Sequence, residues 1–167
     1  MKLMIKQKVF SWGDKFTVYD EAGSEKYKIE GEVFSLGKKL HVYDLNGTEL
    51  VYIQQKLLTF LPRFFVTING QEVAEIKAKF SLLKPKYQVE GLNWQVEGNF
   101  TAHDYAVYAE NGPVVEIRKE WLTWGDTYVL NIADPAHELQ ALAIVLAIDA
   151  VQAQQKNNST TNFNNNN

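Results

Sequence analysis

Two aspartates are the side chains in this sequence whose setting best suits catalysis. Asp14 and Asp126 each follow a glycine in matching segments, residues 11–19 and 123–130. If the fold brought the two turns together, the paired carboxylates could act as acid and nucleophile in a hydrolysis. Gly-Asp is also ordinary turn chemistry, which explains both segments more simply. We therefore expect no enzyme, and a hydrolase using Asp14 and Asp126 is the weakest of three functional hypotheses.

The three histidines do not form a recognisable metal motif. His41, His103 and His137 are scattered, and the chain contains no cysteine. His41 and His103 lie beside strand starts in two related segments, so a paired site is open as an alternative to the structural roles that we favour. No phosphate-binding glycine loop and no dinucleotide fingerprint occurs. We expect neither a metal nor a cofactor.

A cluster of lysines flanks the turn at residues 82–85. Residues two apart on a strand share a face, so these side chains could point outward together and meet phosphate head groups or another acidic partner. A solvated face that protects a strand edge is the alternative, and Glu72 and Glu75 dilute the charge. The candidate residues for binding an anionic head group are Lys77, Lys79, Lys84 and Lys86.

Overall charge and composition narrow the choice of partners. The net charge of −3 gives no general attraction to nucleic acid or to an anionic bilayer, so any such binding needs a local patch. The absence of cysteine fits a reducing compartment, and residues 1–8 lack the apolar core of a secretory signal. We expect a cytoplasmic monomer that does not bind nucleic acid or span a membrane, with peripheral membrane association if the lysines bind lipid.

Repeated turn signals predict an antiparallel β structure. Asn46-Gly47, Asn69-Gly70 and Asn111-Gly112 each precede an alternating run, which is a strong hairpin signal. Related segments recur about every 20–25 residues and give about six two-strand units. The predicted strands are 4–11, 15–20, 27–36, 39–44, 49–58, 64–69, 72–82, 85–90, 93–101, 104–110, 113–123 and 127–131.

One helix near the C-terminus decides how these strands are arranged. Asp134 and Pro135 suit its first positions, and residues 141–148 contain no polar side chain. A helix packed outside a β-sandwich would need a polar face, whereas one that is apolar all round must be buried on every side. We therefore predict a mainly β, closed antiparallel barrel of about 12 strands, wrapped around a helix at 135–153. Its core residues are Leu142, Val145, Leu146, Ile148 and Asp149.

Asp149 closes the apolar run, and two environments remain open for it. Its carboxylate lies either at the barrel mouth, bonded to strand-end amides or water, or against a buried Arg or Lys. Beyond the helix, residues 154–167 are rich in asparagine and have nothing to bury. We predict one domain over residues 1–153 and a disordered tail over 154–167.

These features resemble the tubby-like fold, and within it the LURP-one-related family. The phrases that carry the resemblance are packing and turn motifs: Phe16-Thr17-Val18-Tyr19-Asp20, Tyr27-Lys28-Ile29-Glu30-Gly31 and Ile53-Gln54-Gln55-Lys56. The resemblance covers roughly residues 1–153 and implies a closed barrel around a central helix. Its wider relatives include tubby proteins, which bind phosphoinositide head groups, and phospholipid scramblase-like proteins. No tubby phosphate-binding residue can be placed here by motif.

The leading functional hypothesis is a non-enzymatic binding or scaffold domain that contacts anionic phospholipid through the lysine cluster. The second is a protein–protein interaction module without a lipid role. A lumen filled by the helix leaves little room for a ligand, so we expect function to lie on the outer surface.

Overall fold

Twelve strands and one long helix make up the fold. A computed structural model describes residues 1–6, 15–32, 35–81, 86–122 and 125–164. The strands are β1 (Lys2–Lys6), β2 (Lys15–Asp20), β3 (Glu25–Gly31), β4 (Lys39–Tyr43), β5 (Glu49–Gln55), β6 (Arg63–Ile68), β7 (Gln71–Lys79), β8 (Lys86–Glu90), β9 (Gln95–Asn99), β10 (Asp104–Ala109), β11 (Gly112–Leu122) and β12 (Gly125–Ile132). The helices are η1 (Phe100–Ala102), η2 (Pro135–His137) and α1 (Glu138–Asn164).

Each of the twelve predicted strands has a counterpart in the structure, with shifted ends. The largest differences are at strands predicted to run on into loops, such as β3, which ends at Gly31 instead of residue 36. The alternation of apolar and polar side chains does not mark these ends, because the loops that follow are also rich in apolar residues. Most of the first predicted strand lies at 7–11, outside the described residues.

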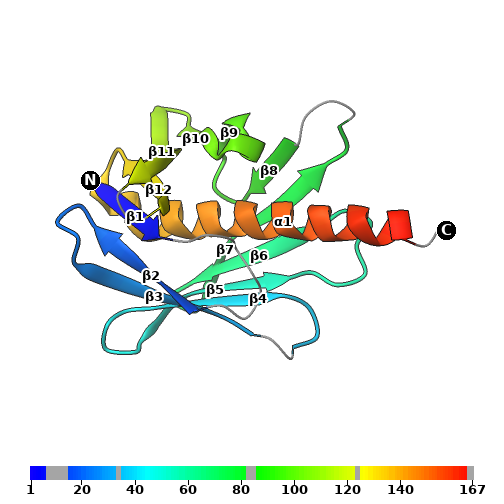
Figure 1. The fold of residues 1–167 in the computed structure, drawn as a ribbon, viewed down its shortest axis with the longest axis horizontal. Coiled ribbons are helices and arrows are strands. Elements are labelled where there is room, and N and C mark those ends of the chain that lie inside the picture. The colour runs from blue at the N-terminus through cyan, green and yellow to red at the C-terminus, as the bar shows by residue number, and fades with distance from the viewer. Residues whose placement is uncertain (7–14, 33–34, 82–85, 123–124, 165–167) are drawn as a thin grey trace.

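The strands form one antiparallel sheet that curls almost into a closed barrel. Every strand pairs with the strands before and after it in sequence, except that β8 and β9 do not pair with each other. Because β1 also pairs with β12, β8 and β9 are the two ends of the sheet. A closed barrel would also join β8 to β9, but no ladder connects them in the described part of the chain. The predicted mainly β barrel is thus confirmed, with one seam where its wall is not hydrogen-bonded (Figure 1).

The internal repeat is visible in the backbone as well as in the sequence. An irregularity in pairing follows Val18, Val42 and Val66, which are spaced 24 residues apart. In the first two units, an aspartate at the start of the turn, Asp20 or Asp44, accepts hydrogen bonds from backbone amides two and four residues later. Side-chain bonds of this kind stabilise tight turns, so the same local sequence builds the same hairpin twice.

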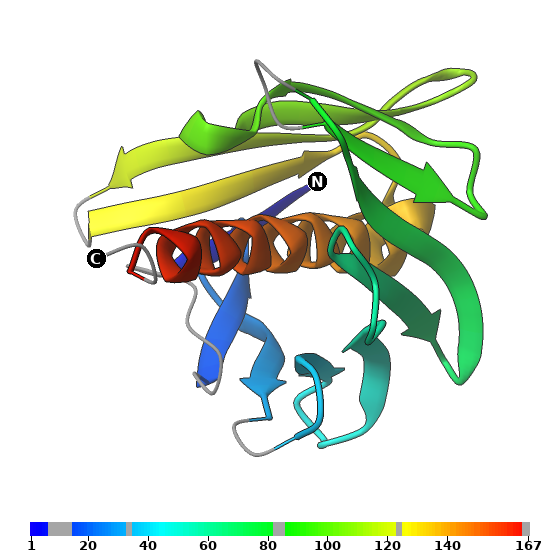
Figure 2. The same ribbon diagram turned by 90° about the vertical axis from the view of Figure 1, so that its right-hand side faces the viewer.

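The helix α1 runs through the middle of the barrel, as Figures 1 and 2 both show. Every residue from 141 to 148 is buried, and α1 packs most closely against β5, β6 and β7. Residues 135–156 have the length and composition of a membrane-spanning helix, but most of that stretch is buried by the surrounding strands. The prediction that strands enclose an apolar helix is confirmed.

The start of the helix is held by polar contacts. Asp134 caps η2, where its side chain accepts a hydrogen bond from the amide of Ala136. At the next turn the hydroxyl of Tyr27 donates to Glu138 Oε1 at 2.8 Å, and Lys26 Nζ lies 2.6 Å from the same oxygen. A carboxylate in the first turn of a helix also complements the helix dipole. These contacts fix the depth at which the helix sits.

The end of the helix differs from the prediction. We expected the helix to stop at residue 153 and a disordered tail to follow, but α1 continues to Asn164. Adding a residue to an existing helix costs far less than nucleating one, so a buried apolar helix can carry polar turns beyond its core. The polar segment therefore extends the helix out of the barrel.

The meander gives the barrel two different ends. The turn end carries the tight turns after β2, β4 and β6, together with the start of α1. The loop end carries the longer connections after β1, β3, β5 and β7, and α1 leaves the barrel there, where Tyr87 at the start of β8 donates a hydrogen bond to Gln155.

Replacing a leucine of the central helix tests whether that helix is the core. Leu142 is fully buried, so Leu142→Ala leaves a cavity and should lower the free energy of unfolding by about 2–5 kcal/mol. Leu58→Ala, at a fully exposed leucine, is the matched control and should change it by less than about 0.5 kcal/mol. Chemical denaturation measures both, and equal effects would contradict a central helix.

Candidate functional site

The predicted lysine cluster lies on the outer face of the barrel at the loop end. Alternating burial along β7 and β8 places Lys77, Lys79 and Lys86 outside, while Lys84 lies beyond the described residues. Lys77 is neutralised by an ion pair with Glu90 on the neighbouring strand. Lys79 and Lys86 are directly opposite each other, and neither forms an ion pair among the described residues, although the charge of Lys79 also helps to lower the pKa of Glu90. Two of the predicted cations therefore remain available to an anion.

Other charges surround this pair. Glu75 lies between two cations, with Arg63 Nη1 at 3.6 Å and Lys56 Nζ at 4.0 Å from its Oε1. The prediction that glutamates dilute the patch fits Glu75, whereas Glu72 lies near the turn end of β7. Cations still outnumber carboxylates on this face, so its loop-end half is positive although the whole chain is negative.

Exposed apolar side chains gather at the same end of the barrel. The described residues include seven large hydrophobic side chains that are exposed, and five of them lie in or beside the loop-end connections. These five form what we call the apolar rim: Leu36, Leu57, Leu58, Phe60 and Phe80. Large apolar side chains clustered on a surface usually mark a contact with a membrane or another protein.

Backbone contacts bring the loops of the rim together. Gly37 lies so close to the next loop that a side chain there would come within 2.9 Å of Leu57 Cδ2. Ala78, two residues before Phe80, donates a hydrogen bond to the carbonyl of Pro62 at the end of the β5–β6 loop. The three connections therefore form one surface instead of isolated exposed residues.

Leu58 is the most exposed residue of the rim and has an unusual backbone. Its φ is 57°, in the left-handed region that costs a residue with a side chain about 1–2 kcal/mol. The side chain is fully exposed, so burial within the protein does not offset this cost. Strain of this kind commonly accompanies functional loops.

The apolar rim is a feature that was not predicted from the sequence. The strand predicted at 49–58 includes Leu57 and Leu58, whereas β5 ends at Gln55 and both leucines lie in the loop that follows. The available signal was the sequence Leu57-Leu58-Thr59-Phe60-Leu61-Pro62, in which alternation fails and a proline follows.

A polar cluster lies inside the barrel near the loop end, around Asp149. The Oδ1 atom of Asp149 is buried, makes no hydrogen bond within the described residues, and lies 3.7 Å from Nδ1 of His103. Burial raises the pKa of Asp149 to about 7, although the charge of Lys156 opposes the shift. Burial also lowers the pKa of His103 and raises that of Tyr105. His103 and Tyr105, which the sequence did not link to Asp149, are its neighbours here, and Lys156 is the cation whose charge acts on it.

The other polar residues with predicted roles lie apart from this cluster. His41 sits on the outer face of β4 between Glu32 and Glu49, and His137 packs edge-on against Trp94. The two predicted partners His41 and His103 therefore belong to different environments. No group of three metal-ligating side chains occurs in the part of the chain that the structure describes. Asp14 and the side chain of Asp126 lie outside it, so the hydrolase hypothesis stays a prediction.

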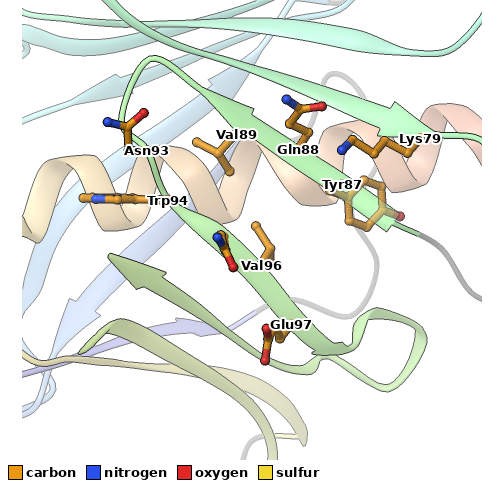
Figure 3. A pocket seen from close by; sticks show the side chains of 9 residues that line it. Lys79, Tyr87, Gln88, Val89, Asn93, Trp94, Val96 and Glu97 are labelled. Atoms are coloured by element: carbon orange, nitrogen blue, oxygen red, sulfur yellow. The ribbon is translucent and has the colours of Figure 1, made fainter. Parts of the chain in front are cut away.

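A pocket of about 440 Å³ opens on the barrel wall where β8 and β9 face each other. Figure 3 shows Tyr87, Gln88 and Val89 on one side and Trp94, Val96 and Glu97 on the other. Lys79 reaches the same pocket from β7 and links it to the basic face.

Comparisons with known proteins agree with this architecture. A family model described as LURP-one-related matches residues 1–149. The chain belongs to the LURP-one-related family. It is 37% identical over 151 residues to the uncharacterized protein YxjI of Bacillus subtilis (strain 168), covering 90% of this chain and 93% of that protein.

A solved structure supports the same fold for this family member. An X-ray structure of a protein from Arabidopsis thaliana superposes with a TM-score of 0.61, at 18% identity, covering 89% of this chain and 90% of that one. Together with the nearly closed barrel and its central helix, this identifies the fold as tubby-like.

Asp149 should make stability depend on pH. Its folded pKa of about 7 lies above the ordinary value of 3.8, so the folded chain holds more protons than the unfolded chain between these values. Stability is then lost as pH rises through this window. Asp149→Asn removes the effect and should match the native chain near pH 4 but exceed its stability by roughly 2–4 kcal/mol near pH 8.

Asp44→Asn is the control of opposite sign. A hydrogen bond from the amide of Thr48 lowers the pKa of exposed Asp44, so its stabilising effect is present at neutral pH and is lost in acid. Denaturant titrations across pH compare the variants. A pH-independent difference between Asp149→Asn and the native chain would contradict the raised pKa.

Proposed function

We propose that this protein is a non-enzymatic binding domain that docks reversibly on anionic phospholipid membranes with its loop end. The observation that carries the proposal is the position of the apolar rim beside Lys79 and Lys86, which form no ion pair among the described residues. Apolar side chains can enter the boundary between head groups and acyl chains while nearby lysines meet phosphates. In this proposal the protein is a cytoplasmic monomer that reaches the membrane peripherally, without a metal or cofactor.

Magnitudes support docking of moderate strength. Removing an exposed leucine or phenylalanine from water contributes about 1.5–3 kcal/mol, and a lysine near an anionic surface contributes about 1 kcal/mol. Leu58 and Phe60 are almost completely exposed and can contribute nearly this full amount. Lost motional freedom offsets part of the sum. The balance fits reversible association better than permanent anchoring.

A protein–protein interaction module is the second candidate, because an exposed apolar surface also suits a protein partner. The interspersed carboxylates Glu75 and Glu90 favour this alternative, since they would face phosphates unfavourably. Lipid dependence distinguishes the two functions.

Removing apolar side chains from the rim tests membrane docking. The double variant Leu58→Ser/Phe60→Ser should bind vesicles of phosphatidylcholine and phosphatidylserine at least about a hundredfold more weakly, because two insertions worth about 1.5–3 kcal/mol each are lost. Leu45→Ser changes an exposed leucine at the turn end and is the matched control. Co-sedimentation at low salt measures binding, and equal binding by both variants would rule out docking through the rim.

Reversing charge at the loop end tests the role of the lysines separately. Lys79→Glu/Lys86→Glu should weaken binding to phosphatidylserine vesicles by more than about tenfold, with little effect on pure phosphatidylcholine. Lys2→Glu/Lys28→Glu alters the net charge equally at exposed lysines on other strands. If no variant and no native protein sediments with either vesicle, the lipid function is wrong and the protein-interaction function takes its place.

A further inference from the structure

The pocket between β8 and β9 meets the edges of the strands, not their faces. It is lined by consecutive residues, 87–89 on β8 and 93–97 at the start of β9. Successive side chains of a strand point to opposite faces, so a pocket that touches consecutive residues lies along the strand edge. A strand edge offers backbone N–H and C=O groups as its main chemistry.

The ladder between β6 and β7 determines which groups of β8 face this seam. The amide of Ala78 donates to Pro62 on the β6 side, so Ala78 turns its backbone groups away from β8. Ala78 is paired with Tyr87, which must therefore also point its N–H and C=O away, into the seam. Because the alternation repeats every second residue, Val89 does the same. Neither residue has another hydrogen bond to these groups among the described residues.

The same reasoning determines which backbone groups of β9, on the other side of the seam, face the pocket. The amide of Ala133 donates to the carbonyl of Val114, which sets the alternation across β11 and β10. The same alternation continues across the ladder between β10 and β9. The backbone N–H and C=O groups of Glu97 therefore bond to β10, and those of Val96 and Gly98 face the seam. Two rows of backbone groups that have no hydrogen-bond partner in the described part of the chain therefore face each other across the pocket.

We propose that this seam binds an extended polypeptide segment of a partner protein as an additional strand. Such a segment supplies donors and acceptors at the spacing that the two edges present, which neither a lipid head group nor a compact small molecule does. Eleven antiparallel ladders separate β8 from β9 around the barrel, so the two edges run in opposite directions. The segment pairs antiparallel with one edge and parallel with the other, as in mixed sheets.

Side chains around the seam define the chemistry of the segment. Tyr87 and Val89 on β8 are buried, and Val96 on β9 is half-buried, so the segment's inward side chains meet an apolar surface. Lys79 lines the outer side of the pocket and forms no ion pair among the described residues. Outward side chains near β8 should therefore be acidic. The occupant is a segment that alternates apolar with acidic or polar residues.

Proline substitutions in β9 distinguish backbone amides that face the seam from those that are hydrogen-bonded to β10. Val96→Pro removes an amide that faces the seam, which strand edges tolerate, and Val96→Ala keeps that amide but shortens the side chain. Glu97→Pro removes an amide bonded to β10 and should destabilise the fold. Val96→Pro should therefore unfold close to the native temperature, whereas Glu97→Pro should unfold at a clearly lower one.

A library of random octapeptides displayed on phage, selected against the full-length chain, supplies the probe. We expect the selected peptides to alternate apolar and acidic residues and to bind folded Val96→Pro at least tenfold more weakly than Val96→Ala. A synthetic copy of a selected peptide should slow the hydrogen exchange of the backbone amides of Tyr87, Val89 and Val96. Lys79→Glu should weaken binding of the acidic peptides and leave the fold intact.

The opposite results overturn the proposal. They are a selection without enriched binders, equal binding to Val96→Pro and Val96→Ala, or slowed exchange elsewhere on the barrel. Slowed exchange at these amides by phosphatidylserine vesicles but not by a selected peptide would assign the seam to lipid. The Leu58→Ser/Phe60→Ser variant should bind the peptide normally, so failure of membrane docking and failure of peptide binding are distinguishable.

Discussion

The fold depends on the need to remove one helix from water on every side. Residues 141–148 offer no polar face, so the only stable surroundings are a wall of apolar side chains that closes around them. Twelve strands provide that wall, each turning alternate residues inward. Because the helix fills the space that a wide barrel would otherwise leave for a ligand, the surfaces left for binding are the barrel ends and the wall.

Much of this architecture could be predicted from local chemistry. Asn69-Gly70 adopts positive φ at both residues, as a two-residue hairpin turn requires, and the turn joins two alternating runs. The apolar run of the helix was equally informative, since it decided between a sandwich and a barrel. The end of the helix could not be read in the same way. Beyond residue 153 the side chains are polar, and helix propagation, not packing, extends α1.

The candidate site was only partly predictable, because its features depend on which segments the barrel brings together. The outward direction of Lys79 and Lys86 could be predicted by counting alternate residues along two strands. The ion pair that neutralises Lys77 with Glu90 depends on the register between β7 and β8, which the sequence does not reveal. Leu58 looked like part of a strand, and its exposure follows from a loop that only the fold defines. His103 lies 46 residues before Asp149, so nothing local links the two side chains.

The seam shows how a barrel can leave one joint open and still keep water from its helix. Aromatic side chains line the inside of this joint. The ring of Phe100 packs edge-on against Tyr87, with 4.6 Å between ring centroids, and lies tilted against Tyr105 at 5.1 Å. Gln152 of the helix donates to the carbonyl of Phe100, which ties η1 to α1. Around the rest of the barrel, both the hydrogen-bonded strands and their apolar side chains shield the helix from water. At the seam the side chains alone cover the helix, so the backbone edges of β8 and β9 stay unpaired without exposing the core.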